Sequence, residues 1–203
     1  MPVSETPSPP YVLCLDGGTE SIRVGLFDQH GRQLSVAACP YPTQFAHSGW
    51  AEQNPDDWWS ALVSATRACL EKAPTEARQI SGFCLDATTC TLVFLGADMK
   101  PLRPALLWMD VRAADQADRI FATHHTALRY SLAGCNAEWM PPKVLWVAEN
   151  EPHVFAQTAF ICEYTDWLVY QLTGRLALNL NTITQRWYYN DRDTGWPESL
   201  FDQ

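Results

Sequence analysis

The stretch from residue 16 to residue 23 contains the residue types that hold phosphate groups. It reads Asp16, Gly17, Gly18, Thr19, Glu20, Ser21, Ile22 and Arg23. Two adjacent glycines let the backbone turn sharply and bring its N–H groups against an anion without a Cβ in the way. Thr19 and Ser21 add hydroxyl donors, and Asp16 is placed to hold Mg²⁺ directly or through water. The alternative is an ordinary hairpin whose turn contains Gly-Gly.

Three predicted strands must position this turn. Tyr11–Leu15 is apolar, and Ile22–Phe27 is rich in β-branched and aromatic residues. Gln33–Cys39 follows a turn at His30 and Gly31. The pattern predicts three consecutive antiparallel strands with the glycine turn between the first two, an arrangement that a small barrel also allows.

Composition limits the class of protein. The chain has 203 residues, 47% of them hydrophobic and 18% charged, which is enough apolar material for the core of one domain or one and a half. The formal net charge is −9 and no basic cluster stands out, which argues against nucleic acid as a partner. No apolar run reaches the roughly 18 residues that a membrane helix needs.

The cysteines and the N-terminus indicate a reducing compartment. The seven cysteines form no C-x-x-C pair, so we expect mostly buried, reduced thiols and a cytoplasmic location. Residues 1–10 are rich in proline and serine and lack the regions of a signal peptide, so we expect a disordered tail.

Three longer motifs accompany the glycine turn in a fixed order. The stretch from Gly49 to Trp59 reads G-W-x-E-Q-x-P-x-x-W-W, and Pro101 to Arg112 reads P-x-R-P-x-x-x-W-x-D-x-R. The stretch from Asp166 to Gly174 reads D-x-L-x-x-x-L-T-G. Together they resemble the motifs of the FGGY carbohydrate kinases. The glycine turn resembles the first phosphate motif of that family, in which Gly17 holds a tolerant position.

The resemblance implies a fold and two cofactors. The fold is α/β, the actin-like (ribonuclease H-like) N-terminal domain of a sugar kinase, with a mixed sheet flanked by helices. It would cover residues 11–203 and be incomplete at its C-terminal end. ATP and Mg²⁺ are the implied cofactors, with Asp16 at the metal. The residues implied at the phosphates are Gly17, Gly18, Thr19, Glu20, Ser21 and Arg23.

A second set of residues is implied at the sugar. It consists of Asp86, Thr89, Cys90, Asp110 and Arg112. The acidic, threonine-rich segment from Asp86 to Thr91 is similar to that of ribulokinase-type members, which favours a pentulose such as ribulose. A carboxylate suits sugar hydroxyls because it accepts two hydrogen bonds in fixed geometry. The alternatives are a plain turn at residues 86–91, a helix cap at Asp110 and a surface ion pair at Arg112.

The remaining elements are expected between these motifs. Two further strands are predicted at residues 80–85 and 92–95. Helices are predicted at residues 55–72, 110–123, 126–132, 142–149 and 163–172, the last ending on a glycine cap at Gly174.

Some parts of a sugar kinase have no counterpart that we can assign in this sequence. In the family the general base and the adenosine pocket lie in later segments, so we assign no catalytic base and expect the chain alone to be inactive. The alternative function is a non-catalytic sugar-binding or interaction module derived from such a kinase. We also expect an exposed apolar surface and homodimer formation through it.

Overall fold

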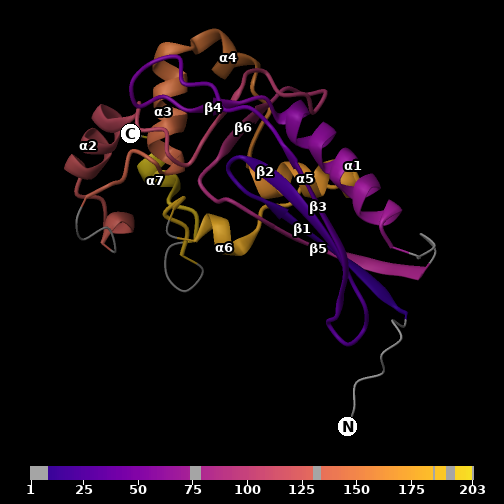
Figure 1. The fold of residues 1–203 in the computed structure, drawn as a ribbon. Coiled ribbons are helices and arrows are strands. Elements are labelled where there is room, and N and C mark those ends of the chain that lie inside the picture. Colours follow the sequence, from indigo (N-terminus) through magenta and orange to yellow (C-terminus); the bar gives the residue numbers. More distant parts are fainter. Residues whose placement is uncertain (1–8, 74–78, 130–133, 185, 191–194, 203) are drawn as a thin grey trace. The chain divides into compact units, whose positions relative to one another are not determined.

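The computed structural model describes residues 9–73, 79–129, 134–184, 186–190 and 195–202 (Figure 1). The chain divides into two compact units, which are described separately. Unit 1 comprises the described parts of residues 1–42 and 56–88, and unit 2 those of residues 43–55 and 89–203. Within the described parts, no helix is long and apolar enough to cross a membrane.

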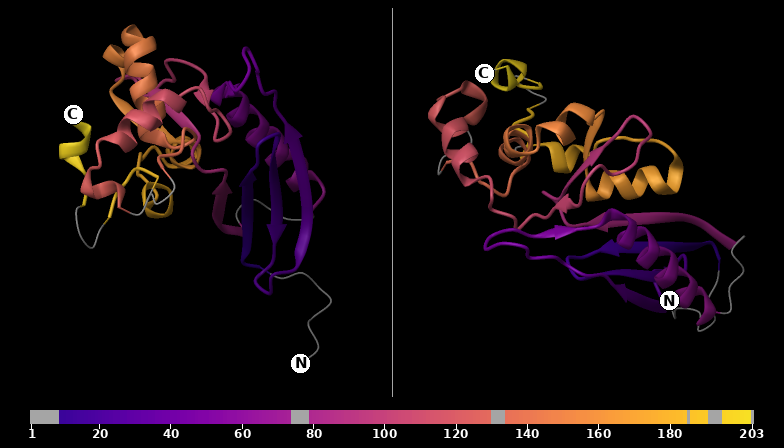
Figure 2. Two further views of the ribbon diagram at one scale, coloured as in Figure 1. Left: turned by 90° about the vertical axis from the view of Figure 1, so that its left-hand side faces the viewer. Right: turned by 90° about the horizontal axis from the view of Figure 1, so that it is seen from above.

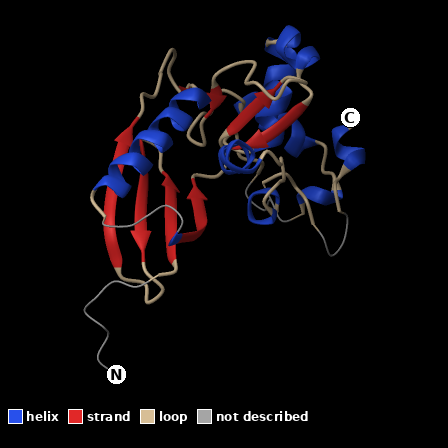
Figure 3. Cartoon of the chain, turned by 90° about the vertical axis from the view of Figure 1, so that its right-hand side faces the viewer, coloured by secondary structure: helices blue, strands red, loops and turns tan. Residues whose placement is uncertain are grey.

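Unit 1 is a four-stranded sheet with one long helix (Figure 3). The strands lie in the order β3-β2-β1-β5. Their bounds are β1 Tyr11–Gly17, β2 Ser21–Phe27, β3 Gln33–Pro40 and β5 Ile80–Ala87, and the helix is α1 Pro55–Glu71. The first three strands are antiparallel, as the sequence predicts, and β5 pairs in parallel with β1, so the sheet is mixed.

Helix α1 lies along one face of this sheet (Figure 2). Trp58 and Cys69 on α1 have no exposed surface, and neither do Val24 and Leu26 on β2. The hydroxyl of Ser35 on β3 lies 3.1 Å from Cys69 Sγ, which places that face of the sheet against the helix. The apolar residues of α1 therefore form one buried stripe along the helix, as expected for an amphipathic helix.

The other face of the sheet carries two exposed thiols. Cys14 on β1 and Cys84 on β5 are in-register partners, and both are exposed. Of the seven cysteines, Cys69, Cys90 and Cys162 are buried. The expectation of mostly buried thiols is therefore wrong for the pair on β1 and β5. Side chains alternate between the faces of a strand, so an apolar sequence does not tell which face is covered.

Unit 2 is built on a second four-stranded sheet in the order β4-β7-β6-β8. The strands are β4 Glu52–Gln53, β6 Leu92–Leu95, β7 Ala105–Leu106 and β8 Phe160–Glu163. The helices are α2 Ala114–Ala122, α3 Met140–Asn150, α4 Pro152–Gln157, α5 Tyr164–Thr173, α6 Leu180–Ile183 and α7 Glu198–Phe201, with a 3₁₀ turn η2 at Thr126–Leu128. All four residues of β6 have no exposed surface, and they form the centre of this unit.

The core of unit 2 forms where α3 packs on β6. Leu92 and Phe94 on the strand contact a buried cluster that includes Met140 and Val147 on the helix. Trp187 is the other large member of the cluster. This packing fixes α3, and with it Lys143, relative to the segments at both ends of β6.

Two of the predicted helices differ from the observed elements by more than two residues at one end. Helix α2 begins at Ala114 instead of Asp110, and its N-cap position is Ala113 with no side-chain cap. The carboxylate of Asp110 instead accepts hydrogen bonds from Arg112 and from another segment, so the helix-cap alternative for Asp110 is wrong. The helix expected at residues 126–132 is a short 3₁₀ turn over Thr126–Leu128, and residues 130–132 lie outside the described parts.

Helix α5 ends as its sequence predicts. Gly174 adopts a left-handed conformation with φ 71°, and its N–H donates to the carbonyl of Tyr170 over 2.7 Å. A glycine meets this conformation without steric cost, which is why the Thr-Gly pair marks the helix end.

Candidate functional site

The predicted phosphate turn joins β1 to β2 in unit 1. Its backbone is closed by a hydrogen bond of 3.0 Å from Gly18 N to Ser21 O. Two other segments hold it from outside, since Thr88 N donates to Gly17 O over 3.0 Å and the Tyr41 hydroxyl donates to Gly18 O. The carbonyl groups of both glycines thus accept hydrogen bonds from neighbouring segments, which fixes the turn in the fold.

A side chain at Gly18 would be tightly confined. A Cβ there would lie 3.1 Å from Arg23 Nη2 and 3.3 Å from Ser21 O. Arg23 forms an ion pair of 2.8 Å with Asp16, and both side chains are about half exposed. An exposed guanidinium next to a backbone turn is suited to a phosphate group, which it can bind through two parallel hydrogen bonds.

Two carboxylates lie side by side at the ends of neighbouring strands. Asp16 on β1 and Asp86 on β5 are in-register partners, and Asp86 accepts a hydrogen bond of 3.0 Å from Ala87 N. No group of three or more metal-ligating side chains occurs among the residues that the structure describes. Mg²⁺ in nucleotide sites is held by one or two carboxylates with phosphate oxygens and water, and Asp16 fits that role.

The segment that contains Thr89 and Cys90 belongs to unit 2. Cys90 has φ 63°, a left-handed conformation that is uncommon for a residue with a side chain. Its N–H donates to Glu163 Oε2 over 2.7 Å, and its carbonyl accepts from Lys143 Nζ over 2.9 Å. Burial raises the pKa of the Cys90 thiol. Cys90 as a whole is 7% exposed, so the reachable groups of this segment come mainly from Thr89.

Asp110 and Arg112 bind each other inside unit 2. Neither side chain has exposed surface, and their shortest contact, from Arg112 Nη2 to Asp110 Oδ2, is 2.7 Å. The other Asp110 partner is Ala51 N at 2.7 Å. Direct contact between this carboxylate and a sugar would require one of these donors to be exchanged. The alternative of a surface ion pair at Arg112 is wrong because the pair is fully buried.

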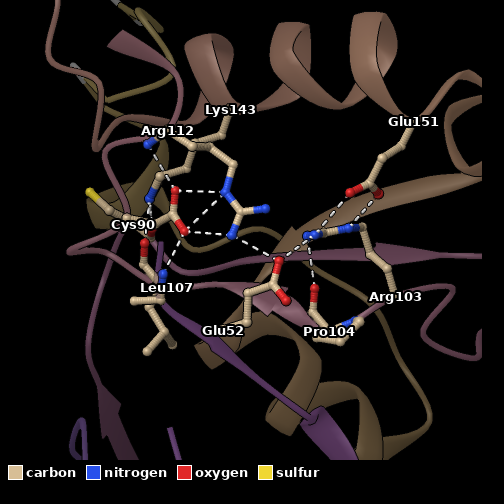
Figure 4. A network of polar contacts seen from close by, with 10 residues as sticks. Glu52, Cys90, Arg103, Pro104, Leu107, Arg112, Lys143 and Glu151 are labelled. Atoms are coloured by element: carbon tan, nitrogen blue, oxygen red, sulfur yellow. Dashed lines mark hydrogen bonds and ion pairs between the residues drawn. The ribbon is translucent and has the colours of Figure 1, made fainter. Parts of the chain in front are cut away.

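A chain of ion pairs extends from Arg112 across the two longest motifs (Figure 4). Glu52 Oε1 lies 2.8 Å from Arg112 Nη2 and 2.6 Å from Arg103 Nη2. Arg103 Nε donates to Glu151 Oε2 over 2.7 Å. The Arg112 guanidinium also lies 3.8 Å from the centroid of the Trp50 ring. Sequence reasoning did not single out Glu52, Arg103 or Glu151, although two of them stand at fixed positions of the motifs.

Two buried charged groups complete the site. Lys143 has no exposed surface and Glu163 is 1% exposed. Burial lowers the pKa of Lys143 to about 8 and raises the pKa of Glu163 to about 7. The carboxylate of Glu163 accepts from Cys90 N and, over 3.3 Å, from Trp187 Nε1. These two roles were not predicted, because a lysine in a helix and a glutamate before one are usually exposed.

Comparison with known proteins identifies relatives over nearly the whole chain. The family model described as the FGGY family of carbohydrate kinases, N-terminal domain, matches residues 11–203. An FGGY carbohydrate kinase domain-containing protein from Xenopus laevis is 32% identical over 203 residues, which cover 95% of this chain and 36% of that protein. A ribulokinase from Geobacillus thermodenitrificans is 29% identical, over 94% of this chain and 38% of the relative.

Solved structures share the fold. A crystal structure of a xyloylose kinase from Brucella ovis matches with a TM-score of 0.77 and 29% identity, covering 81% of this chain and 34% of that one. The mixed α/β, actin-like fold predicted from the sequence is thereby confirmed. This chain spans little more than a third of the length of the relatives that it matches.

Proposed function

Because the chain belongs to the FGGY family of carbohydrate kinases, we propose that it carries the phosphate turn and part of the sugar pocket of an ATP-dependent kinase. The proposed acceptor is a pentulose such as ribulose, and the proposed location is the cytoplasm. The observation that carries the proposal is the turn at Gly17 and Gly18, closed by its own hydrogen bond and flanked by the exposed pair of Asp16 and Arg23.

We propose that the turn binds the phosphates of ATP through backbone N–H groups and hydroxyls. Gly17, Gly18, Thr19, Glu20, Ser21 and Arg23 make up this set. Asp16 would hold Mg²⁺, directly or through water. A bound Mg²⁺ supplies neutralisation of the negative charge on the phosphoryl group. Arg23 is already tethered by Asp16 over 2.8 Å, so its guanidinium is oriented before any ligand arrives.

For the sugar we propose direct contacts from Asp86 and Thr89. Asp86 is exposed and Thr89 is half-buried, so both can present oxygen atoms to hydroxyl groups. Cys90, Asp110 and Arg112 belong to the same proposed sugar site. Because these three residues are buried, we propose that they support the wall of the sugar site. Asp110 and Arg112 fix the segment that follows β7.

The proposed reaction transfers the γ-phosphoryl group in line to a sugar hydroxyl. A base takes the hydroxyl proton, the new P–O bond forms on the sugar oxygen, and ADP leaves with the old bridging oxygen. We assign no residue of this chain as that base. The chain is therefore expected to bind its ligands and to be silent in turnover alone.

A second candidate is a sugar-binding module without chemistry. What favours it is that Asp86 and Thr89 present oxygen atoms to a sugar, whereas no residue of this chain is assigned as the catalytic base. Both candidates predict sugar binding. They differ in whether Mg²⁺ and a nucleotide bind at the turn.

Calorimetric titration with Mg²⁺ and ADP tests the kinase proposal. We expect binding by the unchanged chain, at least a tenfold loss in Asp16→Ala, and no change in Asp98→Ala, which removes an exposed acid elsewhere. In parallel with the titration, ATP-dependent phosphorylation is measured with ribulose, xylulose, ribitol and glycerol as acceptors. Sugar binding without nucleotide binding would favour the module, and binding of neither would refute both candidates.

A further inference from the structure

Two buried charged side chains hold the peptide groups of one residue from opposite sides. Glu163, at the junction of β8 and α5, accepts from Cys90 N over 2.7 Å. Lys143, on α3, donates to Cys90 O over 2.9 Å. The residue between them has φ 63°, a conformation that is unfavourable for a residue with a Cβ. Its left-handed backbone is thus maintained by partners far away in the sequence.

Lys143 also binds a second segment. Its ammonium group donates to Leu107 O over 2.6 Å, in addition to Cys90 O (Figure 4). Leu107 leads into the segment with Asp110 and Arg112, and Cys90 follows Thr89. One ammonium group therefore joins the two parts of unit 2 that carry proposed sugar-site residues.

Further hydrogen bonds connect the same segments. Trp108 N donates to Thr91 Oγ1 over 3.2 Å, and Tyr164 N donates to Thr91 O over 3.0 Å. Thr91 has no exposed surface. The 89–91 segment is thus bound to the 107–108 segment and to the start of α5. The two loops are therefore joined twice, by the hydrogen bond from Trp108 N to Thr91 Oγ1 and by the ammonium group of Lys143.

Burying the ammonium group of Lys143 lowers the stability of the folded state, so a lysine at this position needs a structural reason. Carrying an ammonium group into a place with no exposed surface disfavours its charged form, and an apolar side chain would fill the same volume without that cost. What an apolar side chain cannot do is donate to two carbonyls of different loops at once.

We propose that Lys143 and Glu163 are positioning residues that hold Cys90 in its left-handed conformation and set the spacing between the 89–91 and 107–112 segments. The role in sugar binding rests on the proposed function. The mechanical coupling of the two segments does not, because it follows from the hydrogen bonds alone.

Hydrogen exchange measured by mass spectrometry tests the coupling. In Lys143→Met, which keeps the length of the side chain and removes its donors, we expect amide exchange roughly 10 to 100 times faster in both segments. The control is Lys72→Met, which removes another lysine that donates to a backbone carbonyl, in this case Val36 O at an exposed site. In Glu163→Gln we expect faster exchange in the 89–91 segment and little change at Leu107, whose carbonyl is bound by Lys143.

The pattern of exchange decides the result. Faster exchange throughout unit 2 in Lys143→Met would mean general destabilisation and would overturn the proposal. So would a change in one segment without the other. Ribulose affinity is measured by calorimetry on the same proteins, with a loss of about tenfold or more expected in Lys143→Met and none in Lys72→Met. If the unchanged chain binds no pentulose, the proposed function fails for this chain, and exchange alone decides the coupling.

Discussion

Asp110 and Arg112 form a hydrogen-bonded ion pair out of contact with water. The guanidinium donates to both carboxylate oxygens, from Nε over 2.9 and 3.0 Å and from Nη2 over 2.7 Å. Neither side chain has exposed surface. Removing one member of such a pair leaves the other as an uncompensated buried charge. The pair is therefore a point at which one substitution has a large effect on the fold of unit 2.

Asp110→Ala should destabilise the protein strongly. We expect a loss of about 3 to 5 kcal/mol in the free energy of unfolding, measured by urea denaturation. Arg119→Ala is the matched control, because it breaks the exposed pair of Arg119 and Glu149 and keeps the Gln116 hydrogen bond to Glu149, and it should cost less than about 1 kcal/mol. Equal losses in the two variants would contradict the account of this network.

Glu163 should make stability depend on pH in the acid range. Burial raises its pKa to about 7 in the folded protein from an ordinary 4.5, so the folded state binds the proton more tightly. Its contribution is complete below about pH 4.5 and is lost as the pH rises to about 7. A shift of this size corresponds to roughly 3 kcal/mol. The carboxylate of Asp166 and the ammonium group of Lys143 are the charged neighbours of this group.

Lys143 should act in the opposite direction in the alkaline range. Its pKa is lowered to about 8 in the folded state, so its contribution is complete above about pH 10.5 and is lost as the pH falls through 8. The charged or titratable groups that face it are Cys90, Asp110, Glu138 and Glu163. Chemical denaturation from pH 4 to pH 10 is the measurement. Glu163→Gln should abolish the acid slope and Lys143→Met the alkaline one, and unchanged slopes would contradict both assignments.

Thiol modification should follow the exposure of the cysteines. Cys14 and Cys84 are exposed on β1 and β5, so N-ethylmaleimide followed by peptide mass spectrometry should find them labelled first. Cys69, Cys90 and Cys162 are buried and should react only after unfolding. Early labelling of Cys69 would contradict the packing of α1 on the sheet.

Self-association is expected from exposed apolar side chains in unit 1. Val36 on β3 is 46% exposed and Phe83 on β5 is 45% exposed. Each lies on an edge strand of the sheet, where an exposed apolar side chain favours association between copies. Light scattering should show a dimer whose fraction grows with concentration, and Phe83→Ser should reduce it. A monodisperse monomer at high concentration would contradict this expectation.

Local patterns made the strands and the turn predictable. The strands of unit 1 and the Gly174 cap depend on residues that are near in sequence, such as the Gly-Gly pair and alternating apolar residues. The network around Arg112 was not predictable in this way. Its contact between Glu52 and Arg103 joins residues 51 apart in the chain. Motif residues that suggested sugar contacts, such as Asp110 and Arg112, lie in this network instead of at the surface.

The burial of Lys143 and Glu163 could not be read from the sequence for a similar reason. Each takes its place from the packing of a helix, α3 or α5, against β6 and its neighbours. A single charged residue between apolar ones is equally compatible with an exposed position. The left-handed conformation of Cys90 was also unexpected, because it depends on both partners.

We propose above all that this chain carries a pentulose site in addition to its phosphate turn, formed in part by Thr89 and Cys90. Its most direct test is a titration of the ¹⁵N-labelled chain with ribulose, xylulose, ribitol and glycerol, followed by NMR. The account predicts saturable shifts of the Thr89 and Cys90 amides with a pentulose, and smaller or no shifts with glycerol. A well-dispersed spectrum that no sugar changes at these two amides would contradict it.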